Sequence, residues 1–275
     1  MTRFINPSYD VAFKRIFGQE NSKDLLLDFL NDLLTGEKKI KKIRLIDKEQ
    51  LPLYHKGREG IYDIACEAEE GEHIIVEMQN THQDYFYDRA LYYLSQTVAN
   101  QGERGMKWEF GIKAVYGIFF LNFNLAGKLR TDVILADRDT GKQFSDKLRF
   151  IFVEFPFFKK TKEECVTGLD KWIYVLKNME PLKEIPFKEE KKIFKKSEKI
   201  ADLASLSKED RVRYDADIRA YRDRLAQINS AKRKGITEGE KNKQIEIARN
   251  MKAEGIPVKL ISKVSGLSTE EVEKL

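Results

Sequence analysis

Residues 61–80 read IYDIACEAEEGEHIIVEMQN and are the most informative part of the chain for its fold. Two runs rich in apolar residues flank Glu69-Glu70-Gly71, a pattern typical of a β-hairpin with a three-residue loop. Glycine adopts the left-handed conformation at the end of such a loop at little cost, so Gly71 sets the register. Counting outward from the loop, we expect Asp63 to lie opposite Glu77 on the same face of the hairpin.

Three polar side chains interrupt this predicted hairpin and gather on one face. Alternation with a period of two places Gln79 on the same face as Asp63 and Glu77. The opposite face is apolar and carries Tyr62, Ile64, Cys66, Ile74, Val76 and Met78. Directly opposed carboxylates repel one another unless a cation lies between them or both point into water. We therefore expect one face to build the core and the other to gather acidic groups.

A divalent cation would remove the repulsion between Asp63 and Glu77. Magnesium, like manganese, takes oxygen ligands, binds one or two protein carboxylates, and keeps positions open for water and phosphate oxygens. A metal held in this way activates water and neutralises charge that develops on a phosphodiester. The pattern predicts phosphodiester hydrolysis. The alternative that it leaves open is a solvated acidic face on an edge hairpin.

Helix and strand patterns surround the hairpin on both sides. Apolar residues at helical spacing predict one helix that ends at Gly18, a second from Asn21 to Leu34, a third over residues 84–100, and a fourth around Trp172. Aromatic and β-branched runs predict strands at residues 114–123 and 148–158, joined by a polar connection around Gly141. This order of elements indicates an α/β fold with a mixed central sheet flanked by helices.

The composition changes after residue 180, where strand patterns end and lysine, glutamate and arginine separate sparse apolar residues. We expect one domain over residues 1–180 and a charged, all-helical extension over residues 181–275. The extension ends in EGIPVKLISKVSGLSTEEVEKL, where Gly266 predicts a turn and Ser268 caps a helix together with Glu271. This pattern is typical of a small helix-turn-helix unit. Because its second helix is acidic, packing or self-association is favoured there over DNA reading.

The composition sets broad limits on the class of protein. The chain has 275 residues, with 50 Lys and Arg against 45 Asp and Glu, a net charge of +5 that permits a nucleic-acid partner. Cys66 and Cys165 match no metal-ligand spacing and indicate buried thiols in a reducing compartment. The first residues, MTRFINPSYD, lack a secretory pattern, and no apolar run is long enough to cross a bilayer. We expect a cytoplasmic protein with no membrane partner.

The hairpin also carries a family resemblance. Asp63 on one strand, followed by Glu77-Met78-Gln79 on the next, resembles the motif of the PD-(D/E)XK nuclease superfamily, and in particular its recombination-promoting nuclease and transposase branch. The resemblance extends over residues 4–179 through NPSYDVAFKRIFG, LLLDFLNDLL, YDRALYYLSQ, LRFIFVEFPFF and LDKWIYVLKNM. It implies a restriction-endonuclease-like core, a magnesium or manganese ion held by Asp63 and Glu77, and DNA as the substrate.

The chain departs from the wider superfamily at Gln79, where a lysine is usual, although the branch itself favours glutamine. An amide orients water through hydrogen bonds but supplies no positive charge to a transition state. Lys14 and Arg89 are candidates to supply that charge, and Tyr93 shares the helix face of Arg89. Arg89 alternatively serves only as a structural ion pair. The superfamily also implies an accessory acid in the first helix, here Asp10, which either assists the metal or only stabilises that helix.

These observations support two hypotheses of different classes. The first is a cytoplasmic, metal-dependent DNA endonuclease of low sequence selectivity, linked to recombination or mobile elements, with Asp63, Glu77 and Gln79 as catalytic residues. The second is a catalytically inactive nucleic-acid or protein interaction module on the same fold, in which Gln79 marks lost activity. Self-association through the C-terminal helices is a further expectation.

Overall fold

The computed structural model describes residues 2–46, 49–50, 60–102 and 109–275. Its helices are α1 (Asp10–Phe17), α2 (Lys23–Leu33), α3 (Phe86–Ala99), α4 (Gly168–Asn178), α5 (Ile193–Ala201), α6 (Lys208–Ala253), α7 (Val258–Ser265) and α8 (Thr269–Glu273), with short 3-10 turns at Phe155–Phe157 and Leu203–Ser205. Its strands are β1 (Ile43–Leu45), β2 (Glu49–Gln50), β3 (Gly60–Ile61), β4 (Ile64–Ala68), β5 (His73–Gln79), β6 (Val115–Leu121), β7 (Arg130–Ala136) and β8 (Gln143–Glu154). Contacts divide the chain into two units, residues 1–217 and 218–275, which are described separately.

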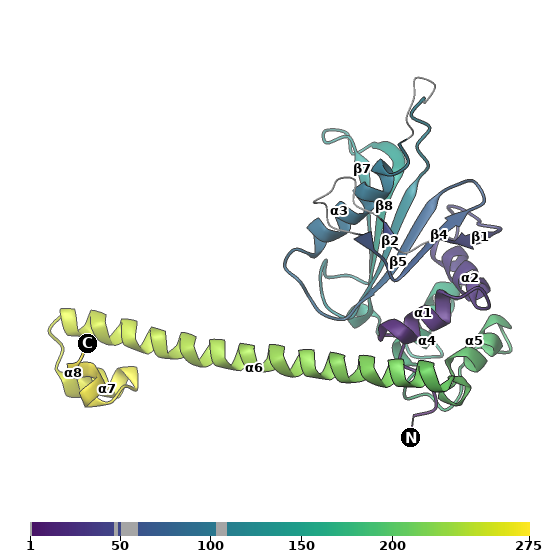
Figure 1. The fold of residues 1–275 in the computed structure, drawn as a ribbon. Helices are drawn as coiled ribbons and strands as arrows, with labels where there is room; N and C mark the ends of the chain where they lie inside the picture. The colour runs from purple at the N-terminus through teal and green to yellow at the C-terminus, as the bar shows by residue number, and fades with distance from the viewer. Residues whose placement is uncertain (1, 47–48, 51–59, 103–108) are drawn as a thin grey trace. The chain divides into compact units, whose positions relative to one another are not determined.

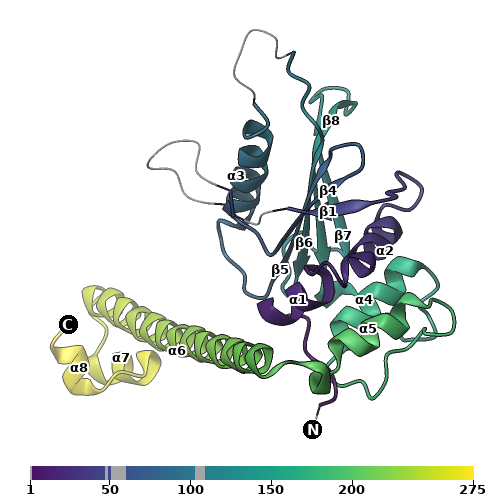
Figure 2. The same cartoon turned by 45° about the vertical axis from the view of Figure 1, so that its right-hand side comes forward.

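A six-stranded mixed sheet forms the centre of the first unit (Figures 1 and 2). Its strand order is β1-β4-β5-β6-β8-β7, and the short strands β2 and β3 pair with each other. Strands β5, β6 and β8 are parallel, whereas β1, β4 and β7 join the sheet in antiparallel pairs. The predicted α/β class, with a mixed sheet flanked by helices, is confirmed.

Helices cover both faces of this sheet, as neighbouring residues of β6 show. Phe119 points to one face, where its ring packs against Phe86 of α3. Phe120 points to the other face and packs against Phe13 of α1 and Phe29 of α2. Because side chains alternate along a strand, the continuous apolar sequence of β6 follows from burial on both faces.

Helix α3 approaches the sheet closely at one residue of β6. A Cβ atom at Gly117 would lie 2.6 Å from the side chain of Leu94, far inside van der Waals contact. The absence of a side chain at Gly117 therefore lets α3 pack directly on the sheet. The face that α3 covers is the face to which Glu77 belongs, so this packing positions the candidate site.

The central hairpin has the expected register. Ile64 pairs with Val76, and Cys66 pairs with Ile74. One step further out in the same register, Asp63 lies opposite Glu77. Gly71 has a φ of 90° and donates its N–H to the carbonyl of Ala68 over 3.0 Å. The left-handed glycine closes the loop as the sequence predicted.

The expected division of the hairpin into a core face and an open acidic face is wrong. Ala65 and Ile75 share the face of Glu77 and are buried in a cluster beneath α3. Tyr62, expected on the other face, belongs to this same cluster and donates its hydroxyl to the carbonyl of Tyr93 over 3.0 Å. Helix α3, which follows the hairpin in sequence, covers a face that the hairpin pattern alone left open to solvent.

Two further expectations are corrected. The polar connection expected between the last two strands contains β7, and β8 begins at Gln143, earlier than expected. Asp137 closes the intervening turn by accepting hydrogen bonds from the backbone N–H groups of Asp139 and Thr140. Helix α2 begins at Lys23, two residues after the expected start at Asn21, and the side chain of its N-cap residue Ser22 makes no capping hydrogen bond.

Residues 181–275 contain helices and no strand, which confirms the all-helical character of this region. In the second unit, α7 and α8 pack on the end of α6 through a small core of Ala248, Ile261, Leu267 and Val272 (Figure 1). Ser268 and Glu271 form the predicted capping box, and Gly266 has a φ of 77°. The domain boundary at residue 180 stays a prediction, since contacts separate the units after residue 217. Across the described residues, no helix combines the length and apolar character that a membrane span requires.

Candidate functional site

Asp63 lies directly before β4, at the end of the hairpin that meets α1. Its Oδ2 atom accepts a 2.9 Å hydrogen bond from the backbone N–H of Met78, which fixes the carboxylate beside β5. Lys14 of α1 places its Nζ 3.8 Å from Asp63 Oδ1 and donates a 2.7 Å hydrogen bond to Asp10. The structure thus brings both predicted accessory residues of α1 to Asp63.

Glu77 is held inside the protein, with only 3% of its surface exposed. Gln79 donates its side-chain amide to Glu77 Oε2 over 3.0 Å. Arg89 Nη2 lies 3.7 Å from the same oxygen, close enough for an ion pair but beyond a hydrogen bond. Among the described residues, Glu77 Oε1 has no hydrogen-bond partner. A buried carboxylate oxygen without a partner is costly and calls for a ligand or a proton.

The electrostatics of the two carboxyl groups reflect their burial and proximity. Burial and, after it, the neighbouring charge of Asp63 raise the pKa of Glu77 to about 8, against the lowering effects of Arg89 and Gln79. Burial also raises the pKa of Asp63 to about 6, with a contribution from Asp10 in the same direction. Perturbed pairs of this kind are frequent at functional sites. Each carboxyl group is therefore stabilised by a proton or a nearby cation.

Arg89 is positioned by residues that the sequence did not single out. Its Nη1 donates a 2.8 Å hydrogen bond to the side chain of Gln83, and its guanidinium lies 5.2 Å from the ring centre of Phe86. Arg89 Nη2 is buried and has no hydrogen-bond partner among the described residues. Tyr93 packs its ring on Tyr62 and, with Arg89, lines a cavity of about 460 Å³. No sequence spacing marked Gln83, because it precedes the helix of Arg89.

Amide side chains join the ends of the parallel strands next to Gln79. Asn122, directly after β6, donates its backbone N–H to the carbonyl of Gln79 over 2.9 Å. The side chain of Asn122 also donates to the Ser8 hydroxyl over 2.9 Å and to the side-chain oxygen of Asn80. Both asparagines directly follow a strand, the place where open α/β sheets put ligand-contacting groups, and this was the signal available in the sequence.

The arrangement of donors can be compared with the needs of a metal ion. Within the described ranges, no group of three or more His, Cys, Asp or Glu side chains has metal-binding geometry. Magnesium commonly needs only one or two protein carboxylates, and the remaining positions are filled by water and phosphate. Glu77 Oε1, buried and unpartnered beside the Asp63 charge, fits a hard cation. The residues present are therefore compatible with the ion that the resemblance implies.

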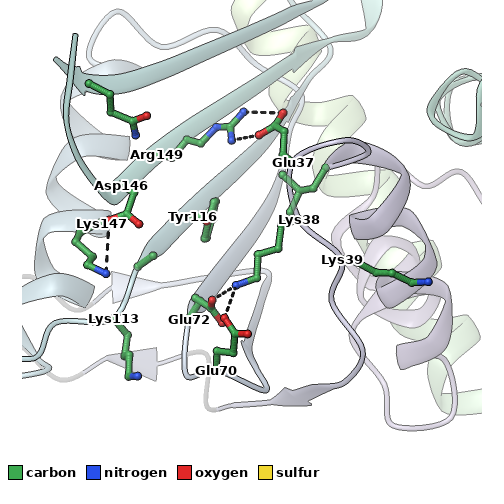
Figure 3. A pocket seen from close by; sticks show the side chains of 13 residues that line it. Glu37, Lys38, Lys39, Glu70, Glu72, Lys113, Tyr116, Asp146, Lys147 and Arg149 are labelled. Atoms are coloured by element: carbon green, nitrogen blue, oxygen red, sulfur yellow. Dashed lines mark hydrogen bonds and ion pairs between the residues drawn. The ribbon is translucent and has the colours of Figure 1, made fainter.

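A second charged cavity, of about 660 Å³, lies at the opposite ends of the same strands. Figure 3 shows its acidic side chains paired with basic ones: Lys38 contacts Glu70 and Glu72, and Arg149 contacts Glu37. Lys38 and Arg149 thus pair directly with acidic side chains of this cavity, although Glu72 Oε2 has no hydrogen-bond partner among the described residues. At the Asp63 end of the hairpin two carboxyl groups of raised pKa lie opposite one another, and the cation nearest to Glu77 among the described residues stays 3.7 Å away, so this end is the better candidate site.

The comparisons with known proteins agree with this geometry. A family model described as PD-(D/E)XK nuclease family transposase matches residues 7–231. The curated proteins and the solved structures gave no significant match. The matched region includes Asp63, Glu77 and Gln79, and it extends past residue 179 through α5 into α6. The family model covers most of the chain, and the protein therefore belongs to the PD-(D/E)XK nuclease family transposases.

Proposed function

We propose that this protein is a metal-dependent DNA endonuclease that hydrolyses phosphodiester bonds with low sequence selectivity and acts in recombination or in the movement of mobile elements. Membership of a nuclease family supplies the reaction class. The observation that carries the proposal is the buried Glu77 oxygen without a partner among the described residues, held beside a second raised-pKa carboxyl, Asp63. Such a pair is expensive for folding and useful for holding a cation.

Asp63 and Glu77 would hold magnesium or manganese, and each has a defined support. The Met78 N–H orients Asp63, and the Gln79 amide orients Glu77. When bound, the ion lowers the pKa of a water molecule and stabilises charge on the phosphate oxygens. The carbonyl oxygen of the Gln79 side chain would accept a hydrogen bond from the attacking water and so orient it. Arg89, already 3.7 Å from Glu77, is the cation that replaces the missing lysine.

The substrate of this nuclease is DNA, and the protein acts in the cytoplasm. Residues 1–180 form the nuclease domain, and residues 181–275 form an extension to it. The net charge of +5 favours association with a polyanion. The protein also self-associates through its C-terminal helices.

Cleavage of supercoiled plasmid DNA tests the assignment. Wild-type protein should nick or linearise the plasmid with magnesium or manganese present and stop when a chelator is added. Asp63→Ala and Glu77→Ala should each abolish cleavage. Glu70→Ala is the matched control, because Glu70 lies in the loop of the same hairpin, is exposed, and pairs with Lys38. Undiminished cleavage by the Asp63 and Glu77 variants would exclude this site.

The second candidate is a non-catalytic module that binds nucleic acid or protein on the same fold. Gln79 in place of lysine is the observation that favours it, because an amide adds no charge to the transition state. The same plasmid experiment separates the two. DNA binding without metal-dependent cleavage by the wild-type protein would establish the module and reject the enzyme.

A further inference from the structure

Helix α6 is 46 residues long, and every residue from 231 to 243 is exposed. A helix gains most of its stability from packing an apolar stripe against another element. Leu225, Ile236 and Ile247 nonetheless remain 44%, 52% and 36% exposed. They recur at intervals of 11 residues, which is about three helical turns, so they form one line along the helix over about 33 Å. Ile228, also exposed, lies beside this line.

The small core of the second unit does not use this line. Ala248 is fully buried against α7 and α8, and Ile245 and Met251 pack around it. Ile247 neighbours Ala248 in sequence but points elsewhere and stays exposed. The apolar line and the surface that holds α7 and α8 are therefore different faces of α6.

Two glycines lie in the middle of the same exposed segment. Gly235 and Gly239 are poor helix formers, and a Cβ atom at either position would meet nothing within 4 Å. No described neighbour therefore requires a glycine at these positions. Gly239 follows Ile236 by three residues, so the two share one side of the helix. A residue without a side chain beside an exposed isoleucine lets a second helix come close.

Opposite charges flank Ile236 at equal distances on its own side of the helix. Lys232 precedes Ile236 by four residues and Glu240 follows it by four, about one helical turn in each direction. If two copies of α6 run antiparallel about Ile236, Lys232 lies opposite Glu240 of the second copy. A parallel pair would instead place lysine against lysine and glutamate against glutamate, which is unfavourable. Charge complementarity therefore selects the antiparallel arrangement.

The apolar line obeys the same symmetry. An antiparallel pair centred on Ile236 places Ile236 against itself and Leu225 against Ile247 of the second copy. Each copy then covers the whole exposed line of the other, as a two-fold symmetric interface requires. We propose that this chain forms a homodimer through antiparallel pairing of residues 225–247 of α6, centred on Ile236. Such a dimer carries two nuclease domains, a consequence that rests on the proposed function.

Sedimentation equilibrium of the full chain tests the interface without reference to nuclease activity. The wild type should sediment as a dimer at micromolar concentrations, and Ile236→Glu should sediment as a monomer. Thr237→Glu is the matched control, because Thr237 is exposed and adjacent but lies off the line, and it should remain dimeric. Circular dichroism should show equal helix content in all three proteins. A monomeric wild type, or an Ile236→Glu dimer, overturns the proposal.

Disulfide trapping tests the orientation. Ile236→Cys should cross-link to itself under mild oxidation, whereas Leu225→Cys alone should not. A mixture of Leu225→Cys and Ile247→Cys should form mixed dimers. The native thiols Cys66 and Cys165 are buried and do not compete. Self-cross-linking of Leu225→Cys would show parallel helices and overturn the antiparallel register.

Discussion

The side-chain amide of Gln79 donates a 3.0 Å hydrogen bond to Glu77 Oε2, while the second oxygen of Glu77 has no partner in the described part of the chain. The residue that replaces the superfamily lysine is therefore tied to the candidate metal ligand. An amide bonded in this way fixes which oxygen of the carboxylate stays available. Gln79 thus orients Glu77 and adds no positive charge beside it.

Replacement of Gln79 tests this role. Gln79→Ala removes the hydrogen bond that orients Glu77, and cleavage should fall about 10- to 100-fold, the usual effect of losing a group that orients a metal ligand. Raising the metal concentration should recover part of the loss. The matched control is Gln143→Ala, an exposed glutamine at the start of β8, which should cleave like the wild type. Equal rates for both variants would exclude an orienting role.

The pH dependence of stability should report on Glu77 in metal-free protein. Burial raises its folded pKa to about 8 from 4.5, so the folded state holds this proton more tightly than the unfolded chain. The resulting stabilisation is fully present below pH 4.5 and is lost as the pH rises towards 8. Glu77→Gln should remove most of this slope. Asp63, with a pKa of about 6, accounts for a smaller part below that pH.

Thermal unfolding in the presence of a chelator, measured from pH 4 to pH 9, provides the comparison. Glu70→Gln serves as the control, since this exposed carboxylate in the same hairpin should leave the wild-type profile unchanged. A Glu77→Gln profile as steep as that of the wild type would contradict the assignment of the slope to Glu77.

Arg89 should matter for catalysis more than for folding. Arg89→Met removes the guanidinium 3.7 Å from Glu77, and the rate of cleavage should fall about 100-fold if this cation stabilises the transition state. Arg89→Lys keeps the charge but loses the hydrogen bond to Gln83, so its cleavage rate should lie between those of the wild type and Arg89→Met. Rates are measured at saturating metal, with urea unfolding alongside. A loss of stability without a loss of rate would assign Arg89 a structural role only.

Gly71 should be intolerant of a side chain for a backbone reason. Its φ of 90° is costly for residues with a Cβ atom, so Gly71→Ala should destabilise the protein by about 1 kcal/mol. Gly111 has no positive φ and no atom within 4 Å of an added Cβ, so Gly111→Ala is the control and should be near neutral. Urea unfolding measures both. Equal stabilities would contradict the role of Gly71 in setting the hairpin register.

Local features of this protein could be predicted from the sequence because they depend on neighbouring residues. The register of the hairpin follows from one left-handed glycine and from the alternation of side chains, both confined to residues 61–80. The capping box of Ser268 and Glu271 follows from a spacing of three residues. Phe13 and Trp172 mark helices through their periodic apolar neighbours.

What the sequence did not determine depends on packing between distant segments. The sequence shows no strand pattern at β7, because its side chains are largely exposed and need not be apolar. Its extended conformation comes from pairing with β8.

The burial of Glu77 was missed for the same kind of reason. Helix α3 packs closely over the hairpin face, and Gly117 of β6, far from the hairpin in sequence, leaves room there for Leu94. The opposition of Asp63 and Glu77 can be predicted from residues 61–80 alone, since strand register is local. The burial of Glu77, its raised pKa and its proximity to Arg89 depend on the packing of distant segments, because desolvation and charge proximity arise when α3 packs over the sheet.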